Sequence, residues 1–258
     1  MTDILIVDFV VVIFIFLRVF SAFIAAPIFG HNAIPIVIKI SLSIVLSYII
    51  FLTIDRSAFN VPVSLWSLTV YGAKEIITGL TMGFMLHFVF YGISYAGTLI
   101  GFDMGLVMAE MFNPMEETSN NVIGEAIYFA SVIILFLING HHYIIRGLVS
   151  SFDLIPLGKF TITNATLELL INYSAGVFVI AVKIASPILV SFFLIHIAEG
   201  ITARAIPQMQ IFFVTQPLKL GLGFVLLASI TPIYIYVIKN LLKGYEDSLY
   251  NLIKAMSN

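Results

Sequence analysis

The chain has 258 residues, of which 60% are hydrophobic and only 10% are charged, and its formal net charge is −2. Soluble domains carry about 25% charged residues, so this composition predicts an integral membrane protein. The sequence has no cysteine, which excludes disulfides and thiol catalysis, and no basic tract that would favour nucleic acid as a partner.

The apolar stretches are too long for the strands of a membrane barrel, which alternate over about 10 residues, so an all-α membrane protein with about six hydrophobic helical segments is predicted. In chain order the predicted helices are 4–26, 34–54, 68–102, 126–145, 167–198 and 212–238. The stretch 68–102 fits either one tilted span or two helices joined near Gly92. The first stretch is expected to be a retained helix rather than a signal peptide, because its first charges are Asp3 and Asp8.

The segments between and after these helices are predicted to be polar. The stretch "SSFDLIPLGKFTITNA" is expected to be a surface loop, because it contains Asp153, Pro156, Gly158 and Lys159. The tail 239–258 is polar and only weakly amphipathic.

Charged residues interrupt the apolar stretches. The charge-free runs 40–54 and 184–198 are shorter than the about 20 residues that a spanning helix needs. Some charges must therefore lie in or beside apolar surroundings, where they pair or face an aqueous path; a lysine or arginine can instead extend to the membrane interface. The embedded charges are Arg18, Lys39, Lys74, Glu75, Lys183, Glu199 and Arg204.

Small residues recur at the spacing that lets helix backbones approach closely. Gly97, Gly101 and Gly105 form a tandem G-x-x-x-G pattern, and Gly79 and Gly83 form a second one. The pattern predicts tight helix packing, either within the chain or against another subunit.

No catalytic motif is present: the sequence contains no H-E-x-x-H, no G-x-S-x-G, no P-loop and no dinucleotide-binding fingerprint. His141 and His142 are adjacent, so on a helix they point about 100° apart and cannot share a metal ion. His31, His87 and His196 are isolated in sequence and are expected to be hydrogen-bonded or interfacial. The chain is therefore predicted to be a non-enzyme without cofactor or metal.

One stretch, "GFDMGLVMAEMFNPMEE", combines methionines with acids. Met104, Met108, Met111 and Met115 lie at a spacing that places them on one helix face, and the helix is expected to end before Pro114. Methionine side chains adapt to changing partners, which suits a movable closure, although the pattern by itself favours a methionine-lined core contact.

The sequence resembles the FliR family of type III export-gate subunits over residues 10–240. The resemblance is carried by "LRVFSAFIAAPIFGHNAIPIVIKISLSIVLS", "KEIITGLTMGF", "IGFDMGLVMAEMFNPM", "LINGHHYIIRGLVSSFDLIPLG" and "EGITARAIPQMQIFFVTQPLKLGLGF". The order and spacing of these motifs are more specific than any one of them, and "NGHHY" and "PQMQIFF" look more like the flagellar than the virulence branch. One position differs: the family commonly has Asp where this chain has Asn113.

The resemblance implies a subunit that assembles with FliP-like and FliQ-like subunits into a channel for unfolded flagellar proteins, in the inner membrane at the flagellar basal body. It implies a FliP-like part at 1–166, a FliQ-like hairpin at 167–238 and a polar tail at 239–258. The segment 101–121 would close the channel as a plug, with Met104, Met108, Met111, Phe112, Asn113, Pro114 and Met115 as its closing residues. The hairpin loop, with Pro207, Gln208 and Gln210, would contact an FlhB-like partner.

Three other interpretations stay open from the sequence. The chain could be a self-contained secondary transporter that uses Arg18, Lys74, Glu75 and Glu199 as coupling charges. It could be the corresponding subunit of a virulence secretion system. It could also be a membrane scaffold without a conducting path.

Overall fold

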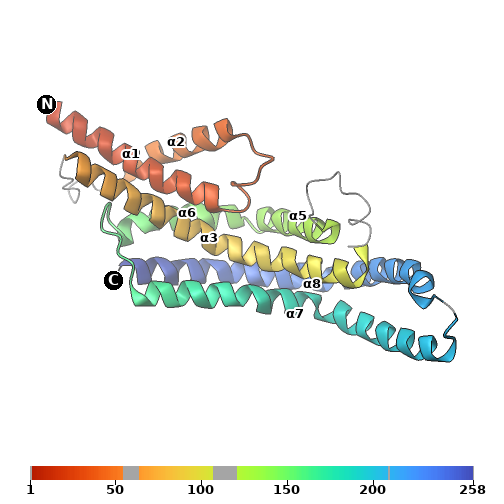
Figure 1. Cartoon of the computed structure of the whole chain (residues 1–258). Helices are drawn as coiled ribbons and strands as arrows, with labels where there is room; N and C mark the ends of the chain where they lie inside the picture. Colours follow the sequence, from red (N-terminus) through yellow and green to blue (C-terminus); the bar gives the residue numbers. More distant parts are fainter. Residues whose placement is uncertain (1, 55–63, 107–120, 209, 258) are drawn as a thin grey trace. The chain divides into compact units, whose positions relative to one another are not determined.

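The computed structural model describes residues 2–54, 64–106, 121–208 and 210–257, and within these ranges all regular secondary structure is helical (Figure 1). The helices are α1 (Thr2–Ala25), α2 (Ile36–Thr53), α3 (Leu65–Asp103), α5 (Val122–Leu137), α6 (Gly140–Leu154), α7 (Asn164–Ala205) and α8 (Ile211–Ser257). Five of these helices are long and apolar enough to cross a membrane, and the bent pair α5–α6 would make a sixth span. The predicted all-α fold with about six hydrophobic segments is confirmed.

The observed bounds of several helices differ from the predicted bounds. Helix α3 is a single helix through Gly92, so the two-helix alternative is wrong. The predicted helix 126–145 is instead two helices that meet at 73°, because Asn139 takes a left-handed conformation with φ 57° between them. Helix α5 begins early because the Asn121 side-chain oxygen accepts the backbone N–H groups of Ile123 and Gly124, as an N-cap does. Helix α8 continues through the polar tail to Ser257.

Pro187 lies inside α7 without ending it. A proline in a helix removes one backbone donor, which leaves the carbonyl four residues earlier without its usual partner. That carbonyl belongs to Lys183, and the Ser186 hydroxyl donates to it at 3.1 Å. The serine therefore supplies the hydrogen bond that the proline cannot, and the helix runs on.

Three helices are much longer than a bilayer requires. Helices α3, α7 and α8 have 39, 42 and 47 residues. At about 1.5 Å per residue they are roughly 58, 63 and 70 Å long, about twice the thickness of a hydrocarbon core of about 30 Å. A bilayer can therefore surround only part of each helix.

The chain forms two compact units, each assembled from separate parts of the sequence. Unit 1 comprises Met1–Phe88, Asn139–Ser174 and Leu242–Asn258, and unit 2 comprises Val89–Ile138 and Ala175–Leu241. Helices α3, α7 and α8 each contribute residues to both units. The sequence-based division at residues 166 and 238 rests on resemblance to FliP-like and FliQ-like proteins, and these compact units do not test it. It therefore stays a prediction.

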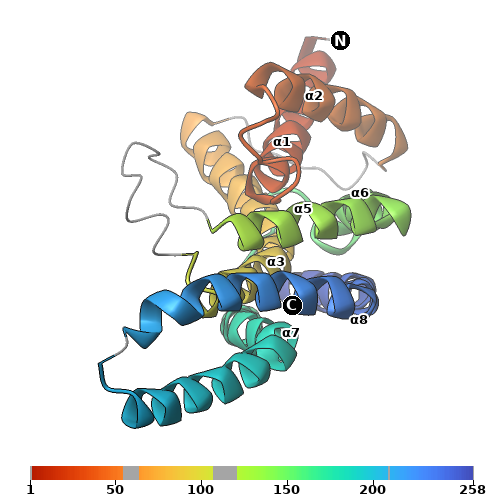
Figure 2. The same ribbon diagram turned by 90° about the vertical axis from the view of Figure 1, so that its right-hand side faces the viewer.

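In unit 1, α1 and α2 form an antiparallel hairpin, and α1 packs against α3 (Figure 2). The close approach of α1 to α3 depends on glycine. A Cβ on Gly79 would collide with the Arg18 carbonyl and the Ser21 hydroxyl, and a Cβ on Gly83 would collide with Ala22 and Ala25. The second small-residue pattern thus packs helices within the chain.

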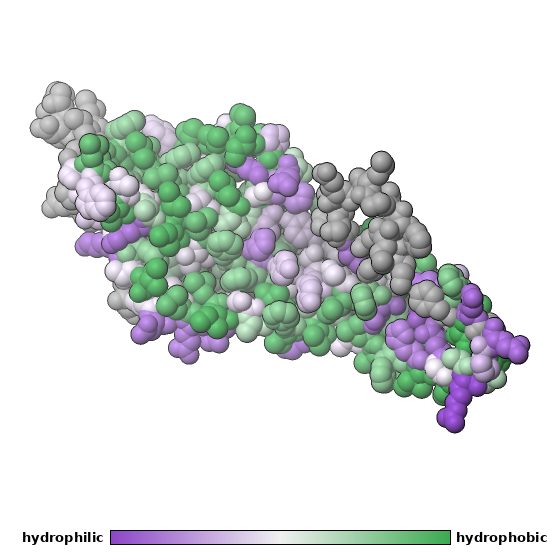
Figure 3. Space-filling model, viewed as in Figure 1, coloured by the Kyte–Doolittle hydropathy of each residue, from purple (hydrophilic) through white to green (hydrophobic). Residues whose placement is uncertain are grey.

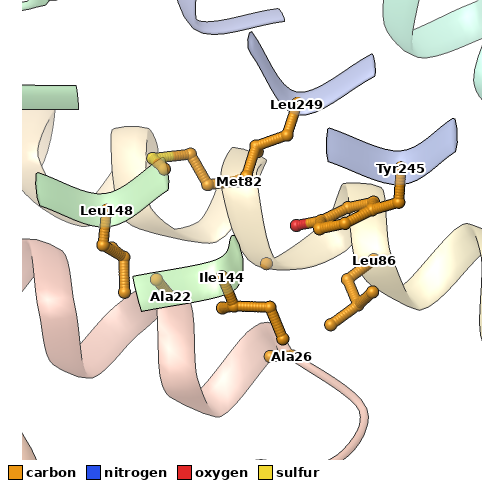
Figure 4. Close-up of a pocket in the computed structure, with 9 residues that line it drawn as sticks. Ala22, Ala26, Met82, Leu86, Ile144, Leu148, Tyr245 and Leu249 are labelled. Atoms are coloured by element: carbon orange, nitrogen blue, oxygen red, sulfur yellow. The ribbon is translucent and has the colours of Figure 1, made fainter. Parts of the chain in front are cut away.

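Unit 1 also encloses a small cavity of about 10 Å³ between α1, α3, α6 and α8 (Figure 4). Tyr245 is its only lining residue with a polar side-chain group, and the other lining residues include Ala22, Met82, Ile144 and Leu249. A volume of this size holds about one water molecule, and a water needs polar partners. The cavity is a gap in side-chain packing and not a ligand site.

In unit 2, the residues 175–205 of α7 and 211–241 of α8 form an antiparallel hairpin (Figures 1 and 2). Its inner face carries small and branched residues, among them Ala181, Ala185 and Ile188, which are fully buried. Gly92 of α3 lies against Ile180 and Val177 of α7. The end of α3 is thereby held on the hairpin, and this contact places the candidate site.

Candidate functional site

A buried ion pair joins α1 to α3 in unit 1. Arg18 Nε donates to Glu75 Oε2 at 2.6 Å, and both side chains are fully buried. A buried charge is tolerated only when it is paired and its other hydrogen-bonding groups are satisfied. Two of the predicted embedded charges therefore neutralise each other, although they lie 57 positions apart in the sequence.

The remaining polar atoms of this pair bind the last turn of α6 and the segment that follows it. The Arg18 guanidinium donates to the carbonyls of Ser151 and Ile155, each at 3.0 Å, and lies 4.2 Å from the centre of the Phe152 ring. Glu75 Oε1 accepts the Gly158 N–H at 2.7 Å. The pair is thus a structural junction of α1, α3 and α6.

The surface-loop prediction for this segment is partly wrong. Ile155, Leu157 and Phe160 are buried, because the backbone that carries them is tied to the Arg18–Glu75 pair. Gly158 has φ +74°, and the Tyr71 ring occupies the place where a side chain would project. Lys74, another predicted embedded charge, donates to the Gly158 carbonyl at 3.1 Å. Residues 155–160, which we call the docking strap, therefore pack against α1 and α3 instead of forming a solvent-exposed loop.

The second cluster lies in unit 2, at the point where the chain leaves α3 towards residues 107–120. Gln216 of α8 donates from Nε2 to the Met104 carbonyl at 3.1 Å. The Met104 side chain is fully buried against Gly223, where a Cβ would collide with it. Gly105 has φ +80° and has the Gln216 side chain where a Cβ would be, so only glycine fits there without strain. We call these four residues the entry anchor.

The chain returns after residue 120 onto the same part of α3. The Asn121 side chain lies directly on Gly101, and Gly97 lies on Gly124 at the start of α5. Gly101 and Gly105 are one helical turn apart. The described residues before and after positions 107–120, Gly105 and Asn121, therefore both lie near the C-terminal end of α3. The three glycines of the tandem pattern, Gly97, Gly101 and Gly105, all face their own chain.

A network of polar side chains lies beside the entry anchor. Lys219 Nζ of α8 lies 2.7 Å from Glu199 Oε2 of α7, and His196 Nδ1 lies 3.2 Å from the same oxygen. His196 Nε2 lies 4.0 Å from Asp103 Oδ1, at the last residue of α3. Lys219 is 5% exposed, so its charge depends on Glu199 for compensation. The network links the hairpin to the end of α3.

Sequence reasoning found Glu199 but missed its partners. His196 lies three positions before Glu199, which is the spacing of neighbours on one helix face and is visible in the sequence. Lys219 approaches from the opposite arm of the hairpin, and no spacing rule predicts that contact. The sequence contained no signal for Gln216, whose described hydrogen bond goes to a backbone carbonyl.

The other predicted site residues fall into two groups. Lys183, Arg204, Pro207, Gln208 and Gln210 are exposed on α7 or at the tip of the α7–α8 hairpin, where hydrophilic residues gather in Figure 3. Most of the predicted plug residues lie outside the described residues: these are Met108, Met111, Phe112, Asn113, Pro114 and Met115.

Among residues 2–54, 64–106, 121–208 and 210–257, no group of three His, Asp or Glu side chains is arranged to hold a metal ion. The buried charges neutralise one another and satisfy backbone groups, so they position helices. The fold and site define a multi-helix membrane protein whose charges serve assembly of the helices.

The comparison with known proteins gives the family. The chain belongs to the family described as bacterial export proteins, family 1, whose model matches residues 9–245. It is 28% identical to flagellar biosynthetic protein FliR of Bacillus subtilis strain 168, over 93% of each chain. It is 25% identical to the protein of that name from Escherichia coli K12, over 93% of this chain and 91% of that protein. The corresponding protein of Aquifex aeolicus is 29% identical, over 87% of this chain and 86% of its own length.

Proposed function

We propose that this chain is the FliR-type subunit of a flagellar protein export gate, through which unfolded flagellar proteins leave the cell. The observation that carries the proposal is the match of the export-protein family to residues 9–245, together with end-to-end similarity to proteins named FliR. The chain contributes to a passage and performs no catalysis of its own. A secondary transporter is disfavoured, because the predicted coupling charges Arg18 and Glu75 form a closed, fully buried pair.

The structure supports membership of a larger assembly. Large apolar side chains are exposed along α7 from Leu167 to Ile201, which at about 1.5 Å per residue is roughly 51 Å. A hydrocarbon core of about 30 Å covers only part of this surface. The rest needs protein partners, for which we propose FliP-like and FliQ-like subunits of the inner membrane at the flagellar basal body.

Deletion and complementation test this function directly. A strain without the gene should lose motility and should not secrete flagellar proteins into the medium, and the full chain supplied in trans should restore both. In a mild detergent, a native gel should place the chain in a large hetero-complex. A monomer or small homo-oligomer in a secreting strain would contradict the gate assignment.

For residues 101–121 we propose the plug role that the family resemblance implies. The described part of this proposal is the base of the segment: the entry anchor, and Asn121 seated on Gly101. A deletion of Met108–Met115 should leave a complex that assembles but leaks ions, measured as membrane conductance. An assembled deletion variant no leakier than the wild type would remove the plug role.

The hairpin tip is proposed as the contact for an FlhB-like subunit. Pro207, Gln208 and Gln210 are exposed there, and no bulky apolar side chain except Ile206 accompanies them among the described residues of the turn. Photocrosslinking amino acids at Gln208 and Gln210 should capture that subunit in cells. Capture of lipid alone would contradict this contact.

A further inference from the structure

Lys183 is a lysine on an apolar, exposed helix face. It lies near the middle of α7, and its side chain is exposed. Exposed valines lie near it: Val179 one turn before, the adjacent Val182 and Val190 two turns after are 52%, 54% and 61% exposed. Glu75, Asp103 and Glu199 pair with basic groups in the described part of the chain, and Lys183 joins none of these three.

The position of Lys183 along α7 makes its charge costly. The charge-free runs on either side, 169–182 and 184–198, are each shorter than the about 20 residues of a membrane span. If α7 crosses the bilayer, an ionisable group therefore lies within its apolar region. Glu199 is compensated by Lys219, whereas no carboxylate among the described residues is paired with Lys183. A charge in this setting needs an opposite charge or water.

The same face also offers room for a close helix contact. Gly176 lies two turns before Lys183, and no atom of its surroundings lies within 4 Å of where a Cβ would sit. Small residues beside an apolar stripe allow another helix to approach closely. Gly176 and the valines together form a surface on which another helix can pack. The Lys183 ammonium requires that this helix carry a negative charge.

We propose that the α7 face formed by Gly176, Val179, Val182, Lys183 and Val190 docks an apolar helix of another subunit, and that this helix presents a carboxylate to Lys183 Nζ. The proposal rests on the proposed function, because it requires the chain to work inside a multi-subunit assembly. The excess length of α7 over a bilayer argues for protein as the occupant, and the uncompensated charge argues for an acid. Like most desolvated ion pairs, this one would fix register and partner choice more than it would add stability.

The test is a comparison of Lys183 variants in the full chain, expressed in a strain that lacks the gene. Lys183→Met would leave the partner's carboxylate buried without its counter-charge, so recovery of the chain in the native complex should fall at least about tenfold. Lys183→Arg keeps the charge and should stay within about twofold of wild type. The matched control is Lys239→Met, at another exposed lysine on α8, where the change should be within about twofold. The amount of chain in the membrane is measured in each case to exclude loss of folding.

Photocrosslinkers at Val179 and Val190 identify the occupant. They should capture a protein subunit. In that subunit, substitution of the acid that faces Lys183 by lysine should restore assembly of the Lys183→Glu variant. Two results would overturn the proposal: Lys183→Met assembling as well as wild type, or capture of lipid alone, since both indicate a lysine that extends to the membrane interface. Failure of the wild-type chain to restore export would instead refute the proposed function, so the two failures are distinguishable.

Discussion

Arg18 Nε donates to Glu75 Oε2 at 2.6 Å, and neither side chain has any exposed surface. Removal of one partner leaves the other charge buried, so Glu75→Leu should lower the free energy of unfolding by about 3–5 kcal/mol. The double variant Arg18→Leu/Glu75→Leu should lose less than the sum of the two single variants, because it leaves no lone charge. Thermal unfolding in detergent measures this cycle. Additive losses would show that the two side chains do not act as a pair.

The packing of α1 on α3 gives a second prediction. Gly79→Ala forces the new Cβ into the Arg18 carbonyl, which is backbone and cannot turn away, so it should destabilise the protein by about 1–3 kcal/mol. The matched control is Gly244→Ala on α8, where no atom lies within 4 Å of the new Cβ. That change should stabilise by up to about 1 kcal/mol through helix propensity. Equal effects at the two sites, measured by thermal unfolding, would contradict the packing argument.

The polar network beside the entry anchor gives a third prediction. Lys219→Met removes the ammonium from Glu199 and should destabilise by about 1–2 kcal/mol, since the lysine is nearly buried. Lys219→Met/Glu199→Gln removes both charges and should recover part of that loss. Thermal unfolding of the two variants in detergent provides the measurement, and no recovery in the double variant would mean that the charges are not coupled.

The entry anchor itself can be tested by hydrogen exchange. Gln216→Leu removes the donor to the Met104 carbonyl, a bond worth about 1 kcal/mol. Amide exchange in the last turn of α3 should therefore rise several-fold, to about tenfold at most, while the complex still forms. Asn240→Leu, an exposed polar residue on the same helix, is the control. Unchanged exchange in Gln216→Leu would mean that the glutamine does not hold this turn.

Sequence reasoning reached the fold class because hydropathy and charge spacing are local signals. It placed α1, α2 and α3 within a few residues of their observed bounds. It missed the break at Asn139, whose left-handed conformation divides α5 from α6, because the apolar stretch continues past it, although Asn139-Gly140 is a turn-forming dipeptide. It also predicted that the segment after α6 lies at the surface, because Pro156 and Gly158 are turn formers. The docking strap is instead held by the ion pair of α1 with α3, two helices that are far apart in the sequence.

The candidate site divides in the same way. The embedded charges could be recognised one by one, because each interrupts an apolar run. Their partners could not, since the pairing of Arg18 with Glu75 and of Glu199 with Lys219 depends on which helices become neighbours. The glycine pattern predicted close packing, and the structure adds what each glycine meets: Gly97 meets Gly124, and Gly101 meets Asn121.

The interleaving of the two units has a consequence for synthesis at the ribosome. Unit 2 needs only residues up to Leu241, whereas unit 1 includes Leu242–Asn258, which are made after all of unit 2. The Ala255 carbonyl accepts hydrogen bonds from the hydroxyls of Thr163 and Thr166 at the start of α7, so the late segment closes onto residues that were made long before. The unit that begins first is thus completed after the other, and until residues 242–258 have been made, the side chains of α1, α3 and α6 that face Tyr245 and Leu249 lack that cover.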